Sequence, residues 1–422
     1  MQEISTQSDE KATLIIHRAA NEIGGNCVEV SAQRTRVLFD FGLPLRSIAE
    51  KKPPRAYRLP LDGVYADDKP AVKAVFLTHA HPDHYGLLGE LHPQIPVYAS
   101  PVTIKLLRYV APLLGFGRLG RLRFIAIHDG EKVKLGPITV TARAVDHSVP
   151  QALAYEICAA QKRIVYTGDL RTHSYCSYLT LRLASLLRPD YLLVEGTSLG
   201  RSAAQAEPEE AVCKRLARLF AGEKKLPVIY FSALNGDRFV SVYKAAREAG
   251  KTLVIDPYTC FVVEQMAQAG LPVPFAYWRG IRVYFAPNSF TRRLKAHLKR
   301  FIRRKISLQE ILSAPQQFII KDNFSLRRSL LRRKQDLYFI HSAWEGYLRE
   351  ADNTFRQDAL AHGFPLDVVH TSGHADVPSL QGLVREMNPK RIVPIHTACA
   401  ANYSQFFNVP VCILQNGDRL AL

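Results

Sequence analysis

The segment Thr78-His79-Ala80-His81-Pro82-Asp83-His84 contains three imidazoles and a carboxylate within one short stretch. It follows the apolar run 74–77, which predicts a buried strand. Nitrogen and oxygen ligands of this kind suit divalent metals such as zinc and manganese. His79 and His81, two residues apart on an extended backbone, can point the same way and hold one ion. The aspartate and the last histidine then turn toward a neighbouring position, so one loop can hold part of two metal sites.

The same arrangement, an apolar run that leads to an acid or a histidine, recurs six more times along the chain. Short runs rich in Val and Ile predict buried strands, and α/β folds place ligands just beyond the carboxyl ends of strands. We therefore expect these polar side chains to converge on one rim. The runs are 36–39 before Asp40, 138–142 before Asp146 and His147, 164–166 before Asp169, 191–194 before Glu195, 368–369 before His374, and 392–395 before His396.

Three of these residues can complete the two metal sites. His147 can supply a third nitrogen to the first ion, Asp169 can bridge both ions, and His396 can complete the second site. Two ions about 3.5–4 Å apart activate a shared water and stabilise the entering and leaving oxygens of a displacement. Asp40 is interpreted as a carboxylate outside the ligand set that fixes the tautomer of a loop histidine. A single histidine is more often structural than ligating, so the prediction depends on the cluster at 79–84.

Composition limits the class of protein. The chain has 422 residues, 47% of them hydrophobic, which is enough for two or three units with sizeable cores. No apolar run approaches the roughly 20 residues that span a bilayer. The start of the chain lacks the pattern of a secretion signal. The seven scattered cysteines contain no CxxC pair and predict free thiols in a reducing compartment. We expect a cytoplasmic protein.

The formal charge of +18 indicates a polyanionic partner. Between residues 200 and 364, a helical stretch from 208 and strand-like runs at 227–231 and 252–255 alternate, which predicts an inserted α/β domain. Two basic clusters, within 292–305 and 327–334, lie in this insert. They can contact nucleic acid or form a solvated face.

The motifs resemble those of a known family. HAHPDH at 79–84, the later Asp146-His147 and Gly168-Asp169 are similar to the successive motifs of the metallo-β-lactamase superfamily. Glu195 in LLVEGT, His374 in TSGHA and His396 in PIHT resemble the additional motifs of its β-CASP branch, which includes ribonuclease J-like nucleases. Residues 231–235, Phe-Ser-Ala-Leu-Asn, resemble the Ser/Asn loop that this branch places near phosphate.

The resemblance implies an α/β fold, a four-layer αββα sandwich with an inserted α/β β-CASP domain. The first part of the sandwich domain would span 1–199, the insert 200–364, and the completing part 365–422. Two divalent ions are implied, with zinc expected and manganese suiting the same ligands. The implied ligands are His79, His81 and His147 on one ion, Asp83, His84 and His396 on the other, and Asp169 between them.

The activity implied by the resemblance is hydrolysis of phosphodiester bonds in single-stranded RNA by a hydroxide that two ions activate. Asp83 and Asp169 would serve both as ligands and in catalysis, and Glu195 with His374 would position the phosphate or protonate the leaving oxygen. His396 favours RNA, because family members that act on DNA tend to carry Val there. The implied contacts to substrate phosphate are Ser232, Asn235, Ser372, Gly373 and His374.

Three alternatives stay open at the level of sequence. A DNA-processing nuclease of the same branch would use the same ligands. A hydrolase of small thioesters or lactams would need neither the insert nor the charge. A non-catalytic RNA-processing scaffold would be expected to have lost ligands. Nucleic acid is the expected partner, with RNA favoured over DNA and no membrane partner. A homodimer is left open, as is the choice between exonucleolytic and endonucleolytic cutting.

Overall fold

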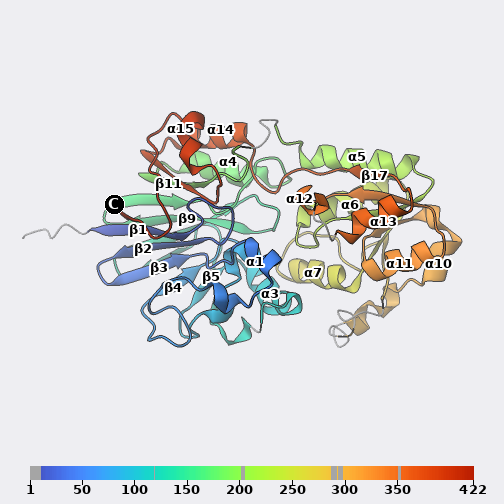
Figure 1. The fold of residues 1–422 in the computed structure, drawn as a ribbon, viewed down its shortest axis with the longest axis horizontal. Helices are drawn as coiled ribbons and strands as arrows, with labels where there is room; N and C mark the ends of the chain where they lie inside the picture. Colours follow the sequence, from blue (N-terminus) through green and yellow to red (C-terminus); the bar gives the residue numbers. More distant parts are fainter. Residues whose placement is uncertain (1–10, 118, 201–204, 287–291, 293–297, 350–352) are drawn as a thin grey trace, which may run out of the picture. The chain divides into compact units, whose positions relative to one another are not determined.

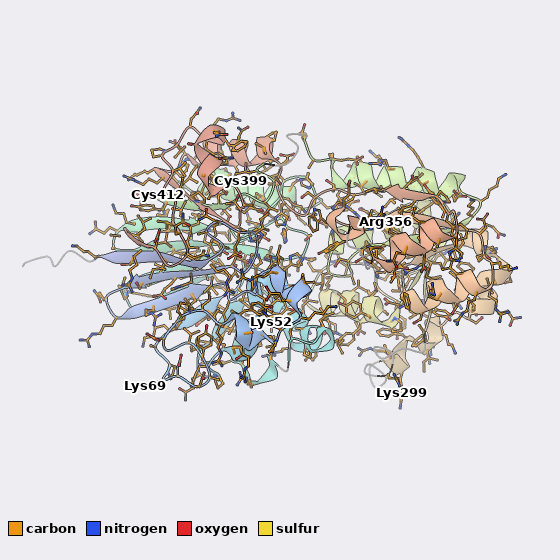
Figure 2. All side chains as sticks on the ribbon, in the orientation of Figure 1. Lys52, Lys69, Lys299, Arg356, Cys399 and Cys412 are labelled. Carbon is orange, nitrogen blue, oxygen red and sulfur yellow. The ribbon has the colours of Figure 1, made fainter. Side chains whose placement is uncertain are left out.

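The computed structural model describes residues 11–117, 119–200, 205–286, 292, 298–349 and 353–422. The described chain forms two compact units (Figure 1). The first unit comprises Met1–Thr172, Cys176–Gln205 and His374–Leu422, and the second comprises His173–Tyr175 and Ala206–Gly373. Among the described residues, no helix has the length and apolar character that crossing a membrane requires. All seven cysteines are free thiols, as predicted, including Cys399 and Cys412 (Figure 2).

The first unit contains a mixed seven-stranded sheet, formed by the last strand of the chain and the first six. Its last strand pairs with its first, with Thr13 opposite Ala421, so the two ends of the described chain meet in one sheet. In spatial order the strands are β19 (Arg419–Ala421), β1 (Ala12–Arg18), β2 (Cys27–Ala32), β3 (Thr35–Phe39), β4 (Ala74–Phe76), β5 (Val97–Ala99) and β6 (Phe124–Ala126).

A six-stranded sheet of the first unit contains most of the strands that the sequence predicts to end in acids or histidines. Strands β10, β11 and β18 of this sheet are parallel, so their carboxyl ends lie at the same edge. In spatial order the strands are β18 (Arg391–Ile395), β11 (Tyr191–Glu195), β10 (Lys162–Tyr166), β9 (Ala152–Ala159), β8 (Ile138–Val145) and β7 (Lys132–Leu135).

Three apolar layers show that the predicted αββα order is correct. One core lies between the two sheets and joins Val30 and Phe76 to Val140 and Ile157. A second core packs the other face of the seven-stranded sheet against Ile104 and its helix neighbours. A third packs the outer face of the six-stranded sheet against three helices. The helices of this unit are α1 (Arg46–Glu50), α2 (Pro82–Tyr85), α3 (Pro101–Tyr109), α4 (Ser177–Leu186), α14 (Val377–Met387) and α15 (Tyr403–Phe406), with single turns η1 (Pro54–Tyr57), η2 (Leu88–Glu90), η3 (Ala111–Leu114), η4 (Leu119–Arg121) and η7 (Ala400–Asn402).

The second unit is the α/β alternation expected between 200 and 364. Its six-stranded sheet is parallel throughout, in the order β14 (Ile281–Val283), β13 (Thr252–Ile255), β15 (Phe318–Lys321), β12 (Leu226–Tyr230), β16 (Leu337–His341) and β17 (Leu366–Val368). Parallel strands need crossover connections, and helices supply most of them. The helices are α5 (Glu209–Gly222), α6 (Gly236–Glu248), α7 (Pro257–Gln268), α10 (Leu308–Ser313), α11 (Phe324–Arg332), α12 (Gly346–Arg349) and α13 (Thr354–Ala361), with single turns η5 (Lys299–Arg304) and η6 (Pro315–Gln317).

One of the predicted strand runs lies in the second unit. The run at 368–369 does not join the sheets of the first unit, because β17 pairs with β16 in the sheet of the second unit. His374 therefore does not reach its position from the end of a strand of the sandwich. The chain returns to the first unit at that residue, where the Ala375 amide donates to the carbonyl of Leu170 at 2.7 Å.

Candidate metal centre

Four ligand-type side chains converge on one point in the first unit. One atom from each of His79, His81, His147 and Asp169 lies within 4.8 Å of the corresponding atoms of the others. The Nε2 atom of His79 lies 2.9 Å from Nδ1 of His81, and Nε2 of His147 lies 3.3 Å from that same Nδ1. Four polar atoms that face one another in this way match the donor set of a divalent cation.

The local backbone explains how one short segment supplies both halves of the centre. His79 follows β4, and His81 is the N-cap of α2 with an extended backbone (φ −99°, ψ 144°). Pro82 then occupies the first helical position, which its fixed φ favours. The single turn of α2 carries Asp83 and His84 away from His81, so the loop contributes to two neighbouring sites.

The second group consists of Asp83, His84 and His396, whose ligand atoms also lie within 4.8 Å of one another. Oδ2 of Asp83 lies 3.8 Å from Nε2 of His84 and 3.9 Å from Nε2 of His396. Asp169 contacts both groups, because its Oδ2 lies 3.2 Å from Nε2 of His84 and 3.7 Å from Nε2 of His79. The structure thus brings together all seven residues that the sequence suggested as ligands.

The protonation preferences of four of the five histidines favour metal binding. His84 is the exception: burial opposes its protonation, but the charges of Asp169, Asp40 and Asp83 outweigh burial and raise its pKa. Burial lowers the pKa of His79, His147 and His396, and it lowers the pKa of His81 to about 4. Neutral imidazoles keep the lone pair that a metal requires. Burial opposes ionisation of Asp169, but the neighbouring His396 and His84 outweigh it and hold the carboxyl pKa well below its usual range.

Buried polar atoms without hydrogen-bond partners also indicate that the site fits bound cations. Among the described residues, Nε2 of His84 and Oδ1 of Asp169 are buried and make no hydrogen bond within the chain. Leaving such atoms without a partner costs about 1–3 kcal/mol each. A divalent cation would supply the missing partner. The residues present therefore fit metal binding, and the ligand types do not choose between zinc and manganese.

A hydrogen-bonded chain outside the ligands fixes two of the rings. Nδ1 of His84 donates to Asp40 at 2.7 Å, and Nδ1 of His396 donates to the amide oxygen of Asn26, also at 2.7 Å. Tyr166 joins the two bonds, since its hydroxyl donates to Asp40 at 2.6 Å and accepts from Nδ2 of Asn26 at 2.9 Å. Both ring protons then sit on Nδ1, and both Nε2 lone pairs are available to the centre.

Sequence reasoning placed Asp40 in such a role but missed Asn26, Tyr166 and Thr78. The Thr78 hydroxyl contacts both Asp40 and Nδ1 of His79, at 2.9 and 3.0 Å. The backbone of Gly42 holds Asn26 in place, since the Gly42 amide donates to the carbonyl of Asn26 at 2.9 Å. A Cβ on Gly42 would lie 1.7 Å from the carbonyl oxygen of Asp83, so this position accepts only glycine.

A buried arginine supports the His147 loop. The side chain of Arg171 is fully buried, and its Nε donates to Oδ1 of Asp146 at 3.1 Å. Its Nη2 also donates to the carbonyl of His147 at 3.3 Å, and the Asp146 amide donates to the hydroxyl of Thr180. Asp146 thus anchors the turn that presents His147 and is not among the potential ligands.

Glu195 and His374 form a pair beside the centre. Nδ1 of His374 donates to Oε2 of Glu195 at 2.8 Å, and the other oxygen of Glu195 accepts from the Leu170 amide at 2.8 Å. Burial disfavours a protonated His374 ring, but the charges of Glu195 and Asp169 outweigh it and raise the pKa of His374 to about 9. The ring is therefore held as a proton donor.

The remaining suggested phosphate contacts lie in the second unit. Asn235 is the N-cap of α6 and accepts from the Arg238 amide at 3.0 Å. The hydroxyl of Ser232 accepts from the Leu234 amide at 3.2 Å, and the carbonyl of Ser372 accepts from His173 at 2.8 Å. These bonds give each residue a local structural role. Contact of Ser232, Asn235, Ser372 and Gly373 with a phosphate stays a prediction.

Two family models match the chain. A β-lactamase superfamily domain matches residues 35–228, and a Zn-dependent metallo-hydrolase RNA specificity domain matches residues 366–404. The first match contains the 79–84 motif, and the second contains His374 and His396. The two matched stretches therefore carry the residues that converge in the structure.

Curated relatives of the chain are ribonucleases J. The chain is 26% identical to ribonuclease J of Sinorhizobium meliloti, with 86% of this chain and 65% of the relative covered. It is 24% identical to ribonuclease J of Pyrococcus abyssi, with 89% and 87% covered, and 23% identical to ribonuclease J 1 of Streptococcus pyogenes, with 100% and 76% covered. The chain spans just under two thirds of the length of the Sinorhizobium relative.

A solved structure supports the fold. The chain is similar to a protein of unknown function from Enterococcus faecalis V583, with a TM-score of 0.77 and 22% identity. The match covers 98% of this chain and 100% of that chain. The likeness concerns the fold alone.

Proposed function

Because this chain belongs to the metallo-β-lactamase superfamily and fits its β-CASP branch, we propose that it is a metal-dependent ribonuclease similar to ribonuclease J. The observation that carries the proposal is the convergence of His79, His81, His147 and Asp169 next to Asp83, His84 and His396. A centre of this composition suits hydrolysis of a phosphodiester, since two cations can face the phosphoryl oxygens from one side.

RNA is the proposed substrate, and single-stranded RNA is the proposed form. The match to an RNA specificity domain supports RNA over DNA, and so do the relatives, which are named ribonucleases. The charge of +18 supports a polyanionic partner. We further propose a cytoplasmic location and no membrane partner, and a homodimer stays an open alternative.

We assign one ion to His79, His81 and His147 and a second to Asp83, His84 and His396, with Asp169 shared. When bound, such ions supply Lewis-acid charge to the phosphoryl oxygens and lower the pKa of water. The chain's own contribution is orientation. Asp40 and Asn26 fix the tautomers of His84 and His396, so the ligand atoms are arranged before any ion arrives.

The pair of Glu195 and His374 acts on the leaving group. The Glu195 carboxylate keeps a proton on the His374 ring through the 2.8 Å bond to Nδ1. The opposite ring nitrogen, Nε2, can then donate a proton to the departing 3′ or 5′ oxygen. The Leu170 amide holds Glu195 from the other side, so the pair keeps its orientation.

The second unit is proposed to be the β-CASP domain. The division into 1–199, 200–364 and 365–422 stays a prediction, and Ser232, Asn235, Ser372 and Gly373 are the candidate phosphate contacts. Its strongly basic composition supports a role in holding the RNA backbone.

The proposal is tested by incubating the purified chain with end-labelled single-stranded RNA and with DNA of matching sequence. Zinc, manganese and a chelator are compared. We expect RNA to be cut with metal and not with chelator. His81→Ala and Asp83→Ala should abolish cutting and leave RNA binding within a few-fold, while the exposed Lys69→Ala should cut like the wild type. Equal cutting of DNA would favour the DNA-processing alternative, and full activity in either ligand variant would refute the ligand assignment.

A further inference from the structure

We propose that the second unit has a stacking platform for single-stranded RNA at the edge of its sheet, formed by Tyr277, Trp278, Arg279, Arg303 and Arg304. We call these five residues the Trp278 platform. The inference rests on the proposed ribonuclease function for the identity of its ligand. The platform contains none of the suggested metal ligands, phosphate contacts or members of the Glu195–His374 pair.

Two large aromatic side chains, neighbours in the sequence, are exposed in the turn before β14. Tyr277 is 43% exposed and Trp278 is 40% exposed. Each is braced from beneath by other rings. The centroid of Trp278 lies 5.7 Å from that of Tyr243 in an edge-to-face contact, and Tyr277 lies 6.5 Å from Phe301. Exposed aromatic faces on a fixed base are what unpaired nucleobases stack on.

The turn is fixed to the edge of the sheet. β14 is an edge strand, and the following segment 305–306 pairs along it through a parallel bridge between Val283 and Lys305. Arg282 reinforces this contact by donating to the carbonyls of Arg304 and Lys305 at 3.2 and 2.6 Å. The platform is therefore part of the folded sheet and not a loose tail.

Hydrogen bonds connect the turn to the basic segment. The hydroxyl of Tyr277 donates to the carbonyl of Arg300 at 2.6 Å. Nη2 of Arg304 donates to the carbonyl of Tyr277 at 2.6 Å, and its guanidinium lies 6.0 Å from the centre of the Tyr277 ring. Tyr277 is thus joined directly to the basic segment that contains Arg300 and Arg304.

Part of the charge of this surface is not neutralised by neighbouring acids. Arg282 pairs with Glu310, and Arg300 pairs with Glu264. By contrast, Arg279 and Arg303 are exposed and form no ion pair with any carboxylate in the described part of the chain. Lys299, labelled in Figure 2, and Lys305 add two more exposed cations. Uncompensated guanidinium groups beside a stacking surface match a strand with phosphates and unpaired bases.

A single strand fits this surface better than a duplex. In a duplex the bases are stacked on one another and offer no free face to Trp278, whereas a single strand can place a base on the ring and its phosphates on the arginines. A protein partner would need acidic residues opposite the arginines, and it has no nucleobases to stack on the exposed rings. We therefore assign the platform to single-stranded RNA.

The two tryptophans of the chain allow a direct test. Only Trp278 and Trp344 are present, and Trp344 is 50% exposed elsewhere in the second unit. In a His81→Ala background, which should not cut RNA, Trp344→Phe leaves Trp278 as the single indole. An oligouridylate of about 16 nucleotides should then quench its fluorescence on binding. The matched Trp278→Phe chain, which reports only Trp344, should show little quenching.

Affinity gives an independent measurement. Trp278→Ala should weaken binding of the oligouridylate about five-fold or more, while Trp344→Ala should leave it unchanged. Arg279→Gln with Arg303→Gln should lower the slope of log affinity against log salt by about 1.4, which is about 0.7 for each phosphate contact of a single strand. The control pair, Lys69→Gln with Arg356→Gln, removes the same charge from exposed positions marked in Figure 2 and should keep the slope.

The outcomes separate this inference from the proposed function. If the wild-type chain cuts RNA but Trp278 is not quenched and the salt slope is unchanged, the platform is refuted and the ribonuclease stands. If the chain does not cut RNA but Trp278 is quenched and the slope falls, the ribonuclease is refuted and the platform stands. Quenching by duplex RNA as strong as by the single strand would also overturn the inference.

Discussion

Two buried polar clusters, one in each unit, are built on opposite principles. In the second unit, the buried Arg238 donates to both oxygens of Glu209 at 2.7 and 3.0 Å and to the carbonyl and hydroxyl oxygens of Ser342 at 2.9 and 2.7 Å. In the first unit, ring nitrogens face one another, as in the 2.9 Å contact between His79 and His81. The Arg238 cluster joins hydrogen-bond donors to acceptors, whereas the histidine cluster gathers acceptor atoms around one point.

The difference distinguishes structural from functional burial of polar groups. A donor–acceptor cluster compensates its own desolvation and needs nothing from outside the chain. Several imidazole lone pairs and an ionised carboxylate gathered together do not compensate one another, so their arrangement makes sense only with a cation. Substitutions should therefore affect activity in the histidine cluster of the first unit and folding stability in the Arg238 cluster of the second unit.

The largest effect is expected at the proton donor. His374→Gln can still donate a hydrogen bond to Glu195 but cannot give up a proton, so kcat for RNA cleavage should fall by about 10²–10⁴-fold with KM little changed. Because Glu195 is buried and loses its charged partner, the free energy of unfolding should also fall, so circular dichroism should verify that the variant is folded under the assay conditions. A kcat within a few-fold of the wild type would remove His374 from the reaction.

The second cluster should respond in the reverse way. Arg238→Met leaves the carboxylate of Glu209 buried without its cation, and the free energy of unfolding measured in urea should fall by about 3–5 kcal/mol. The exposed Arg356→Met should change it by less than about 0.5 kcal/mol. Adding Glu209→Leu to Arg238→Met should restore much of the loss. If the single variant were as stable as the wild type, the contrast between the clusters would fail.

A smaller effect is expected for the hydrogen bonds that orient the metal ligands. Tyr166→Phe removes the hydroxyl that joins Asp40 to Asn26, and zinc affinity measured against a chromogenic chelator should fall about 10–100-fold. Tyr155→Phe is the matched control, because that buried hydroxyl donates to the carbonyl of Leu77 and makes no hydrogen bond to Asp40 or Asn26. Both variants should lose stability without metal, but only Tyr166→Phe should lose zinc. Equal zinc affinity in the two would show that the hydroxyl has only a structural role.

Much of the fold follows from local sequence. The Val- and Ile-rich runs before Asp40, Asp169, Glu195 and His396 become β3, β10, β11 and β18, because short apolar runs of this type have few other ways to be buried. The run before His374 also forms a strand, β17, and it lies in the sheet of the second unit. Which sheet a strand joins depends on contacts with β16, far back in the sequence, and no local pattern encodes that choice.

The identity of the candidate ligands was determined by the sequence alone, since spacing within 79–84 and position after a strand are local properties. Tertiary structure alone decided what surrounds them. Asn26 reaches His396 across 370 residues and Tyr166 across 140, and Arg238 meets Glu209 on a neighbouring helix. A hydrogen bond needs two atoms within about 3 Å in the right direction. Only the folded chain brings such distant residues that close.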